Sequence, residues 1–301
     1  LAWARSLAAD QDDRTPADFG RPVNRWVTTV NAHPDFTVEN HALVHVGYLK
    51  LTLTMLLESA THYMIAGRPT PGACFHHVPE GLDVILRAMA WDGSPVFFGG
   101  NDWKIFHSQP TDVLLYAVLN VAQSDRRAAY LEATALDWLG RMQQREDGFY
   151  NVRRDLEYGG LCATRLVACY LAHAAGPESA RPLSPQEFDQ SVSGASRLEY
   201  AQAILHRTPT KFASFSWGPK RMSLALPQDG NWVLWPHFAS YLGTVDGKDA
   251  SRKNANLTVL KETVDDNSFC VAASFARLDG RIANAFGVGG GMHPAAAAAV
   301  V

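Results

Sequence analysis

The sequence predicts a protein of two parts, an α-helical domain over residues 1–205 followed by an antiparallel β domain over residues 206–301. Up to about residue 205, apolar residues recur at helical spacing, in segments joined by loops rich in Gly, Asp and aromatic residues. Beyond residue 210, short segments alternate apolar and polar residues between Asp, Gly and Asn turns. The helices come in pairs at spacings of about 40–50 residues, which is typical of a toroid built from helical pairs. The expected fold is therefore an incomplete (α/α) toroid followed by an antiparallel β-sheet or sandwich.

The helices are placed by their apolar period and by their end signals. Residues 1–30 are expected to form a helix followed by a Pro/Gly turn. The segment 49–65 is apolar on nearly every face and is predicted to be an inner, buried helix. The sequence Gly67-Arg68-Pro69 ends it. Further helices are predicted over residues 82–90, 111–122, 126–145 and 161–174.

The β part begins with a predicted hairpin. Residues 210–218 and 221–227 both alternate, and a Gly-Pro turn separates them. Further short strands are expected over residues 232–238, 257–264, 268–276 and 281–288. Together these segments predict an antiparallel sheet packed after the helical domain.

Composition narrows the possible partners. The chain has 301 residues, of which 47% are hydrophobic and 19% charged, as in folded globular proteins. The net charge is -3 and the Lys and Arg residues are scattered, which argues against a nucleic-acid partner. No apolar run reaches the roughly 18 residues that span a bilayer, so no membrane partner is expected. The four cysteines show no zinc-ligand spacing. The chain starts at Leu1 within an amphipathic pattern, and we expect it to be a segment of a longer protein.

One stretch, residues 37–48, combines side chains of several chemical types. Asn40, His41, His45 and Tyr48 bring an amide, two imidazoles and a phenol to the start of an apolar helical segment. On a helix, the two histidines and the tyrosine would share one face, with the asparagine beside it. Such a polar cluster is costly to bury unless it binds something. We predict that it binds an acidic sugar; the alternative is that it only caps the helix.

A second polar segment, residues 97–110, lies between two predicted helices. Paired glycines let the backbone approach a ligand closely, and Asn101, Trp103 and His107 follow them. This composition is typical of a loop that lines a ligand site. The alternative is an ordinary loop between helices with a buried tryptophan.

A third segment, residues 146–160, joins two predicted helices. Its acidic and glycine residues are expected to end the helix at Arg145 and to cap the helix that begins at Leu161. It carries Arg153 and Arg154, followed by Tyr158 between acidic and glycine residues. This arrangement would place the phenol of Tyr158 at the mouth of the toroid.

The chain resembles polysaccharide lyases that have an α/α toroid followed by antiparallel β-sheets. The group includes heparinase II/III-like and alginate-lyase-like enzymes. Its Asn-His signature is similar to Glu39-Asn40-His41…His45…Gly47-Tyr48. The same layout is fitted by Asp147-Gly148-Phe149…Asp155…Tyr158-Gly159 and by Phe215-Ser216-Trp217-Gly218. The common heparinase-like form of the signature is Asn-Asn-His-Gly, where this chain has Glu39-Asn40-His41-Ala42, so the subfamily and the substrate stay open.

The resemblance implies β-elimination at a uronic acid. The C5 proton can be removed only if hydrogen-bond donors neutralise the adjacent carboxylate, a role implied for Asn40 with assistance from His41. A base removes the proton and an acid protonates the leaving glycosidic oxygen. Tyr158 is the first candidate for the acid, and for the base as well if the elimination is syn. His107 and Tyr48 are the alternative candidates.

Substrate binding is predicted for a wider set of side chains. Arginines beside a catalytic tyrosine would lower its pKa, or would hold substrate carboxylates in bidentate pairs. The predicted substrate-binding residues are His45, Asn101, Trp103, Arg153, Arg154 and Arg165. The resemblance implies no metal and no cofactor. The expected partner is an acidic polysaccharide, and a secreted or periplasmic location is expected because such polymers are too large to enter a cell intact.

Two other functions fit the same residues. A glycoside hydrolase on this scaffold would need two carboxylates across the cleft, and Asp102, Asp147 and Asp155 are available for that role. A glycan-binding protein without activity would need only aromatic and polar contacts. A metal site formed by His41 and His45 is a weaker idea, since no acidic partner stands at a suggestive spacing.

Overall fold

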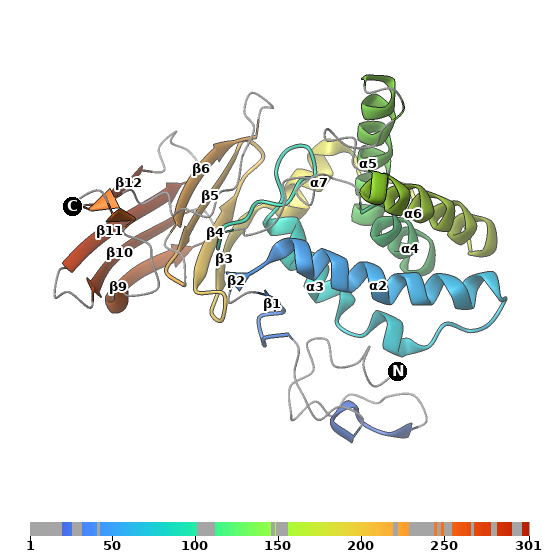
Figure 1. Ribbon diagram of the computed structural model, residues 1–301, viewed down its shortest axis with the longest axis horizontal. Helices are drawn as coiled ribbons and strands as arrows, with labels where there is room; N and C mark the ends of the chain where they lie inside the picture. The colour runs from blue at the N-terminus through green and yellow to red at the C-terminus, as the bar shows by residue number, and fades with distance from the viewer. Residues whose placement is uncertain are drawn as a thin grey trace.

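The computed structural model describes residues 20–25, 32–40, 43–100, 112–145, 148, 156–218, 222–228, 244–245, 248–249, 255–265, 268–277, 282–290 and 297–300. Within these residues, helices come first and antiparallel sheets follow. Figure 1 shows the helices on one side of the molecule and the two large sheets on the other. The change from helix to strand falls between Val192 and Gly194, ahead of residue 206, where the sequence pattern placed it.

Six α-helices form the described helical part. They are α2 (Val46–Ile65), α3 (Val78–Arg87), α4 (Val113–Gln123), α5 (Arg126–Arg145), α6 (Leu156–Ala175) and α7 (Pro185–Val192). Short 3-10 turns occupy Val23–Arg25 and Gly72–Phe75. The predicted helix over 126–145 is confirmed at both ends. The short helix α7, with its Ser184–Glu187 capping box, was not predicted from the apolar pattern.

Three of these helices, α2, α4 and α6, contact one another and run in the same direction. At one end, Asp112, the residue before α4, contacts Lys50 of α2 and Arg165 of α6. At the other end, Gly176, just after α6, lies against the side chains of Val121 of α4 and Met64 of α2. In each helix, the residue at the end near Asp112 comes earlier in the sequence than the residue at the end near Gly176. The three helices are therefore parallel, and their N-termini lie on the same side.

Two four-stranded antiparallel meanders form the β part. The first contains β3 (Gly194–Leu198), β4 (Ala203–Arg207), β5 (Lys211–Ser216) and β6 (Met222–Pro227), in that order. The second contains β9 (Ala255–Asp265), β10 (Ser268–Arg277), β11 (Ile282–Gly290) and β12 (Ala297–Val300). The described residues also form two short hairpins, which are β1 (Glu39–Asn40) with β2 (Leu43–Val44) and β7 (Thr244–Val245) with β8 (Lys248–Asp249).

The first sheet lies between the helices and the second sheet. Ala203 and Leu205 of β4 pack into the core shared with the helices, whereas Ile204, between them, packs into a second core. That second core includes Phe215 of β5 and Val271 of β10, so it lies between the two sheets. Strand β4 is buried at every residue because both of its faces are covered.

The predicted hairpin over 210–227 and the predicted strands over 257–264, 268–276 and 281–288 are confirmed as β5–β6, β9, β10 and β11. The strands β3 and β4 lie where the sequence pattern indicated helices. The predicted strand over 232–238 lies outside the described residues, as do residues 1–19 of the predicted first helix. Residues 156–160 were expected to cap the helix and instead form the first turn of α6.

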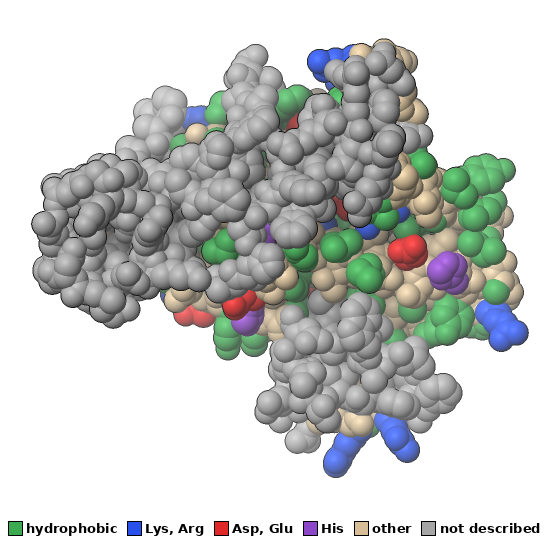
Figure 2. All heavy atoms as spheres, in the orientation of Figure 1, with side chains coloured by type: hydrophobic (Ala, Val, Ile, Leu, Met, Phe, Trp, Pro, Cys, Tyr) green, Lys and Arg blue, Asp and Glu red, His purple; other side chains and the backbone are tan. Residues whose placement is uncertain are grey.

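Several large apolar side chains of α2 and α6 face outward. On α6, Tyr170 is 72% exposed and Val167 is 59% exposed, and on α2 Met55 and Ile65 are also exposed. Figure 2 shows apolar side chains at the surface of the helical part. None of the described helices is both long and apolar enough to span a lipid bilayer.

Candidate functional site

Asn40 and residues 43–45 are not helical, which corrects the helical face predicted for this stretch. Asn40 in β1 pairs with Leu43 in β2, so only residues 41 and 42 connect the two strands. His45 follows with extended backbone, at φ -127 and ψ 100, and α2 begins at Val46. An extended residue interrupts the helical period, so side chains before and after His45 cannot share one helical face. The hairpin instead comes directly before the N-terminus of α2 in the chain, with only His45 between them.

His45 is the N-cap of α2. Its Nδ1 accepts a hydrogen bond of 3.3 Å from the backbone N–H of Tyr48, which satisfies one of the free donors of the first turn. The imidazole is 1% exposed and meets the rings of Tyr48 and Phe97 edge to face, at centroid distances of 4.8 and 5.0 Å. The structure therefore gives His45 the capping role, and Tyr48 lies beside it, partly buried.

Asn40 carries an unsatisfied polar atom. Its Oδ1 is buried and has no hydrogen-bond partner among the described residues. A buried amide oxygen without a partner costs roughly 1–3 kcal/mol, so such atoms usually mark a place where a water or a ligand binds. Among the predicted catalytic residues that the structure describes, Asn40 is the one with a buried side-chain atom that lacks a hydrogen-bond partner.

The loop that follows α3 packs against this hairpin. The backbone carbonyl of Val44 lies close to Gly99, so that an added Cβ there would be 3.4 Å from the carbonyl oxygen. Gly100 has a φ of 92, a conformation that strongly favours glycine. The paired glycines were predicted to let the backbone approach a ligand, and in the described structure Gly99 lies against the hairpin that carries Asn40.

A buried charged cluster lies where α2, α4 and α6 meet. Lys50 Nζ is 2.6 Å from Asp112 Oδ2, and Arg165 Nη1 is 3.6 Å from Asp112 Oδ1. All three side chains are largely buried, with Lys50 1% and Arg165 6% exposed. Two cations thus share one carboxylate, which leaves one positive charge in excess within this trio. The Asp92 carboxylate also acts on Lys50 and offsets part of this charge, and burial of the remainder favours an anion nearby.

The phenol of Tyr116 on α4 belongs to the same cluster. Its hydroxyl is buried without a hydrogen-bond partner among the described residues. Burial raises the pKa of Tyr116 to about 12, against the opposing effect of Lys50, so the phenol stays protonated at neutral pH. Burial lowers the pKa of Lys50, but the nearby Asp112 and Tyr116 outweigh it, so the pKa of Lys50 is raised overall.

The other predicted site residues lie at the edges of the described chain. His41, Asn101, Trp103, His107, Arg153 and Arg154 are outside the described residues. Tyr158 is described by its backbone, as the third residue of α6. Arg165 lies two turns further along α6 and is turned toward Asp112, within the buried cluster.

The sequence did not single out Lys50, Asp112 or Tyr116. A lysine in an apolar helix is usually exposed, and the partner carboxylate is distant in the sequence, so neither residue signals a pair. The available signal was a lysine on the predicted inner helix 49–65, which is apolar on nearly every face. A buried lysine requires a carboxylate partner, and Asp112 stands at the start of the next inner helix.

No group of three His, Cys, Asp or Glu side chains that could hold a metal ion occurs in the described part of the chain. Comparison with known proteins identifies no relative. No protein-family model matches the sequence, and neither a curated protein nor a solved structure matches it significantly. Inference about function therefore depends on the residues and on their geometry.

Proposed function

We propose that the protein is a polysaccharide lyase that cleaves a uronic-acid-containing polymer by β-elimination. One observation carries the proposal: each of the three segments predicted to bind substrate leads into the N-terminus of one of three parallel helices. Residues 37–45 precede α2, residues 97–112 precede α4, and residues 146–155 precede α6. Because the three N-termini lie on the same side, all three segments join the helices at one end of the helical part.

Electrostatics at this end support an acidic substrate. The N-terminus of a helix carries a partial positive charge, and the N-termini of α2, α4 and α6 lie on the same side here. The excess positive charge shared by Lys50, Asp112 and Arg165 adds to that field. A uronate carboxylate, or the enolate formed when its C5 proton is removed, would be stabilised by both contributions.

Asn40 is proposed to bind the substrate carboxylate, with His41 beside it. The Nδ2 of Asn40 would donate to that carboxylate, and its buried Oδ1, which has no partner among the described residues, would accept from water or from a substrate hydroxyl. Tyr158, in the first turn of α6, is proposed as the acid, with Tyr48 and His107 as the alternatives. The capping role of His45 fixes the start of α2 and so the position of Tyr48.

We further propose that the helices belong to an α/α toroid. The parallel direction of α2, α4 and α6, with α3 and α5 between them in the chain, supports this arrangement. The exposed apolar side chains of α2 and α6 also support it, since a toroid would cover them with further helices.

The test is a screen for the ultraviolet absorbance of the C4–C5 double bond that elimination creates. The purified protein is incubated with alginate, glucuronan, hyaluronan, chondroitin sulfate or heparan sulfate. Absorbance should rise with one of these polymers, and Asn40→Ala and Tyr158→Phe should each abolish the rise. Tyr170→Phe is the matched control, because Tyr170 is 72% exposed on the same helix and should keep full activity.

Other outcomes would redirect the assignment. A rise that survives Tyr158→Phe would transfer the acid role to Tyr48 or His107. New reducing ends without a rise in absorbance would replace the lyase by a glycoside hydrolase. Binding of a polymer without any product would favour a glycan-binding protein.

A further inference from the structure

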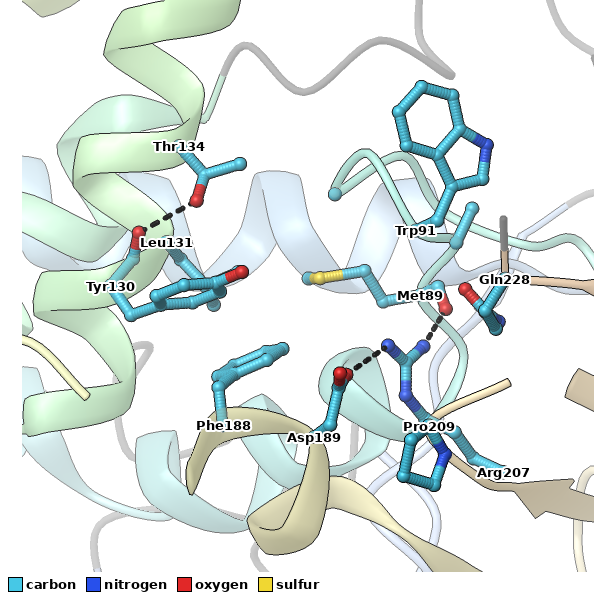
Figure 3. Close-up of a pocket in the computed structure, with 12 residues that line it drawn as sticks. Met89, Trp91, Tyr130, Leu131, Thr134, Phe188, Asp189, Arg207, Pro209 and Gln228 are labelled. Carbon is cyan, nitrogen blue, oxygen red and sulfur yellow. Dashed lines mark hydrogen bonds and ion pairs between the residues drawn. The ribbon is translucent and has the colours of Figure 1, made fainter. Parts of the chain in front are cut away.

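A small cavity lies between the helical part and the first sheet, and it shares no residue with the candidate site. It has a volume of about 80 Å³. Five segments contribute to it, and they are the turn after α3, helices α5 and α7, the end of β4 and the residues that follow it, and Gln228 after β6. Figure 3 shows the polar side chains of Asp189, Arg207 and Gln228 on one side of it and the rings of Tyr130 and Phe188 on the other.

Arg207 is the buried cation of this cavity. It is 3% exposed, because it is the last residue of β4 on the face turned toward the helices. Its Nη1 donates to the backbone carbonyl of Met89, and its Nη2 lies 3.6 Å from Asp189 Oδ1. Its Nε has no hydrogen-bond partner among the described residues. One strong donor of a fully buried guanidinium therefore remains available.

Gln228 adds both a donor and an acceptor. Its backbone N–H donates to the carbonyl of Thr210 at 2.8 Å, which fixes the residue after the end of β6. Its side-chain Oε1 and Nε2 are both buried, and neither has a hydrogen-bond partner in the described structure. An amide with both ends unsatisfied is unfavourable, so an occupant that both accepts and donates is required.

The charge balance of the cavity selects a neutral occupant. Arg207 and Asp189 are of opposite sign and form a neutral pair. A carboxylate or phosphate would satisfy the two donors but would leave Gln228 Oε1 without a donor and would lie near the Asp189 carboxylate. A hydroxyl group both donates and accepts, so adjacent hydroxyl groups match the whole set.

The rim and the wall of the cavity are aromatic. Tyr130 and Phe188 stack with a centroid distance of 4.4 Å, and Trp91 is 44% exposed where the turn after α3 reaches the surface. An exposed indole beside buried hydrogen-bonding groups gives an apolar face next to a polar pocket. A sugar ring has this same division, with C–H groups on its faces and hydroxyl groups along its edge.

We propose that this cavity is a binding site for a neutral sugar ring, whose adjacent hydroxyl groups enter between Arg207 and Gln228 and whose face lies on Trp91. The volume admits one edge of the ring and leaves the remainder outside. The site does not depend on elimination chemistry, because none of its residues is proposed to act on the uronate. In a polymer that alternates uronic acids with neutral sugars, it would select for the neutral unit.

The test measures the Kd of methyl β-D-glucopyranoside by ligand-observed NMR, with methyl β-D-glucuronide as the acidic comparator. The neutral glycoside should bind more tightly than the glucuronide. Gln228→Leu removes the amide at similar volume, and Trp91→Ala removes the indole; each should raise the Kd about tenfold, since each removes one or two favourable contacts. Gln186→Leu, at an exposed position of α7 outside the cavity, is the control and should leave the Kd unchanged.

The outcomes separate this inference from the lyase proposal. Absence of binding by the wild-type protein, an equal Kd in all variants, or tighter binding of the glucuronide would each overturn the neutral-sugar site. Circular dichroism of each variant shows that the fold is kept. Because this readout is equilibrium binding of a single ring, it can fail while polymer cleavage is observed, and cleavage can fail while it succeeds.

Discussion

Asp112, at the start of α4, lies 2.6 Å from Lys50 of α2 and so joins two parallel inner helices through one buried ion pair. The same carboxylate faces Arg165 of α6 at 3.6 Å. One side chain therefore contacts all three of the parallel helices α2, α4 and α6. In the described part of the chain, Lys50 and Arg165 form no ion pair with a second carboxylate, and Asp92 acts on Lys50 from beyond ion-pair distance.

Asp112→Asn is expected to destabilise the protein more than Lys50→Met. Loss of the carboxylate charge leaves two buried cations uncompensated, which costs about 3–5 kcal/mol. Loss of Lys50 leaves Asp112 paired with Arg165, so no buried charge is left without a partner and the cost should be only about 1–2 kcal/mol. Urea unfolding followed by circular dichroism gives both values. Equal losses would show that Arg165 does not compensate Asp112.

Stability at alkaline pH should depend on Tyr116. Its pKa is raised from 10.0 to about 12 by burial, so between these values the unfolded chain loses a proton that the folded chain keeps. The unfolded state then binds fewer protons, and the free energy of unfolding falls as the pH rises. The pKa of Lys50 is also raised, so its contribution is present below pH 10.5 and is lost above it, in the same direction.

Tyr116→Phe should flatten this dependence by up to about 1.4 kcal/mol per pH unit in the window from pH 10 to 12. Below pH 10, it should cost little, because the hydroxyl it removes has no partner in the described structure. Urea unfolding at several pH values measures the slope, with the exposed Tyr170→Phe as control. Burial also raises the pKa of Cys169 to about 12, so the comparison must be between variants. Identical slopes for Tyr116→Phe and the wild type would contradict the prediction.

Two glycines of the helical part should respond to alanine in opposite ways. Gly176 follows α6, where an added Cβ would overlap the side chain of Val121 and lie 2.8 Å from the carbonyl oxygen of Ala172. Gly176→Ala should cost about 1–3 kcal/mol, since the helices must move apart. Gly140 lies inside α5 with no atom within 4 Å of its added Cβ, so Gly140→Ala should stabilise by about 0.5–1 kcal/mol. Thermal unfolding of the two variants checks both signs.

The helices and strands that could be predicted are those whose own sequence determines one buried face. Helix α5 matches its prediction at both ends because its apolar residues repeat at the helical period, with Arg145 in its last turn. Strand β4 could not be recognised, since both of its faces are covered and its alternation is lost. The stretch before α2 was misread as helix because histidine capping and a two-residue hairpin connection leave no clear mark in the apolar pattern.

The candidate site was predictable only in part, because its parts come from distant segments. Asn40 and Tyr48 were proposed from an unusual local cluster of polar groups. The pairing of Lys50 with Asp112 depends on how two helices pack, and nothing local in the sequence specifies it. The cavity around Arg207 is harder still, since five segments meet there and its key groups are ordinary polar residues near strand ends.

The connection after α6 should loosen when Asn120 is changed. Its Oδ1 accepts a hydrogen bond of 2.8 Å from the backbone N–H of Ala180, and its Nδ2 donates to Glu132 Oε2 at 2.8 Å. The other oxygen of Glu132 lies 2.6 Å from His173 Nε2, and His173 Nδ1 lies 2.9 Å from Ser179 Oγ. Asn120→Ala should therefore speed cleavage after Glu178 by a glutamate-specific protease. Mass spectrometry identifies the cut, and Asp137→Ala, at an exposed surface pair, should not change its rate.

Binding of an acidic polymer should be most sensitive to the charge at position 40. Asn40→Asp keeps the size of the side chain but replaces a donor with a negative charge, which would repel the substrate carboxylate. If Asn40 neutralises that carboxylate, kcat/KM should fall by at least about 10²–10³, the range seen when one oxyanion donor is lost.

Asn40→Ala should weaken polymer binding less than Asn40→Asp does, because it removes the donor without adding repulsion. The polymer Kd, measured at low and high salt, separates the two, since repulsion in Asn40→Asp should be weakened by salt and the loss in Asn40→Ala should not. Equal losses at both salt concentrations would place the substrate carboxylate away from Asn40.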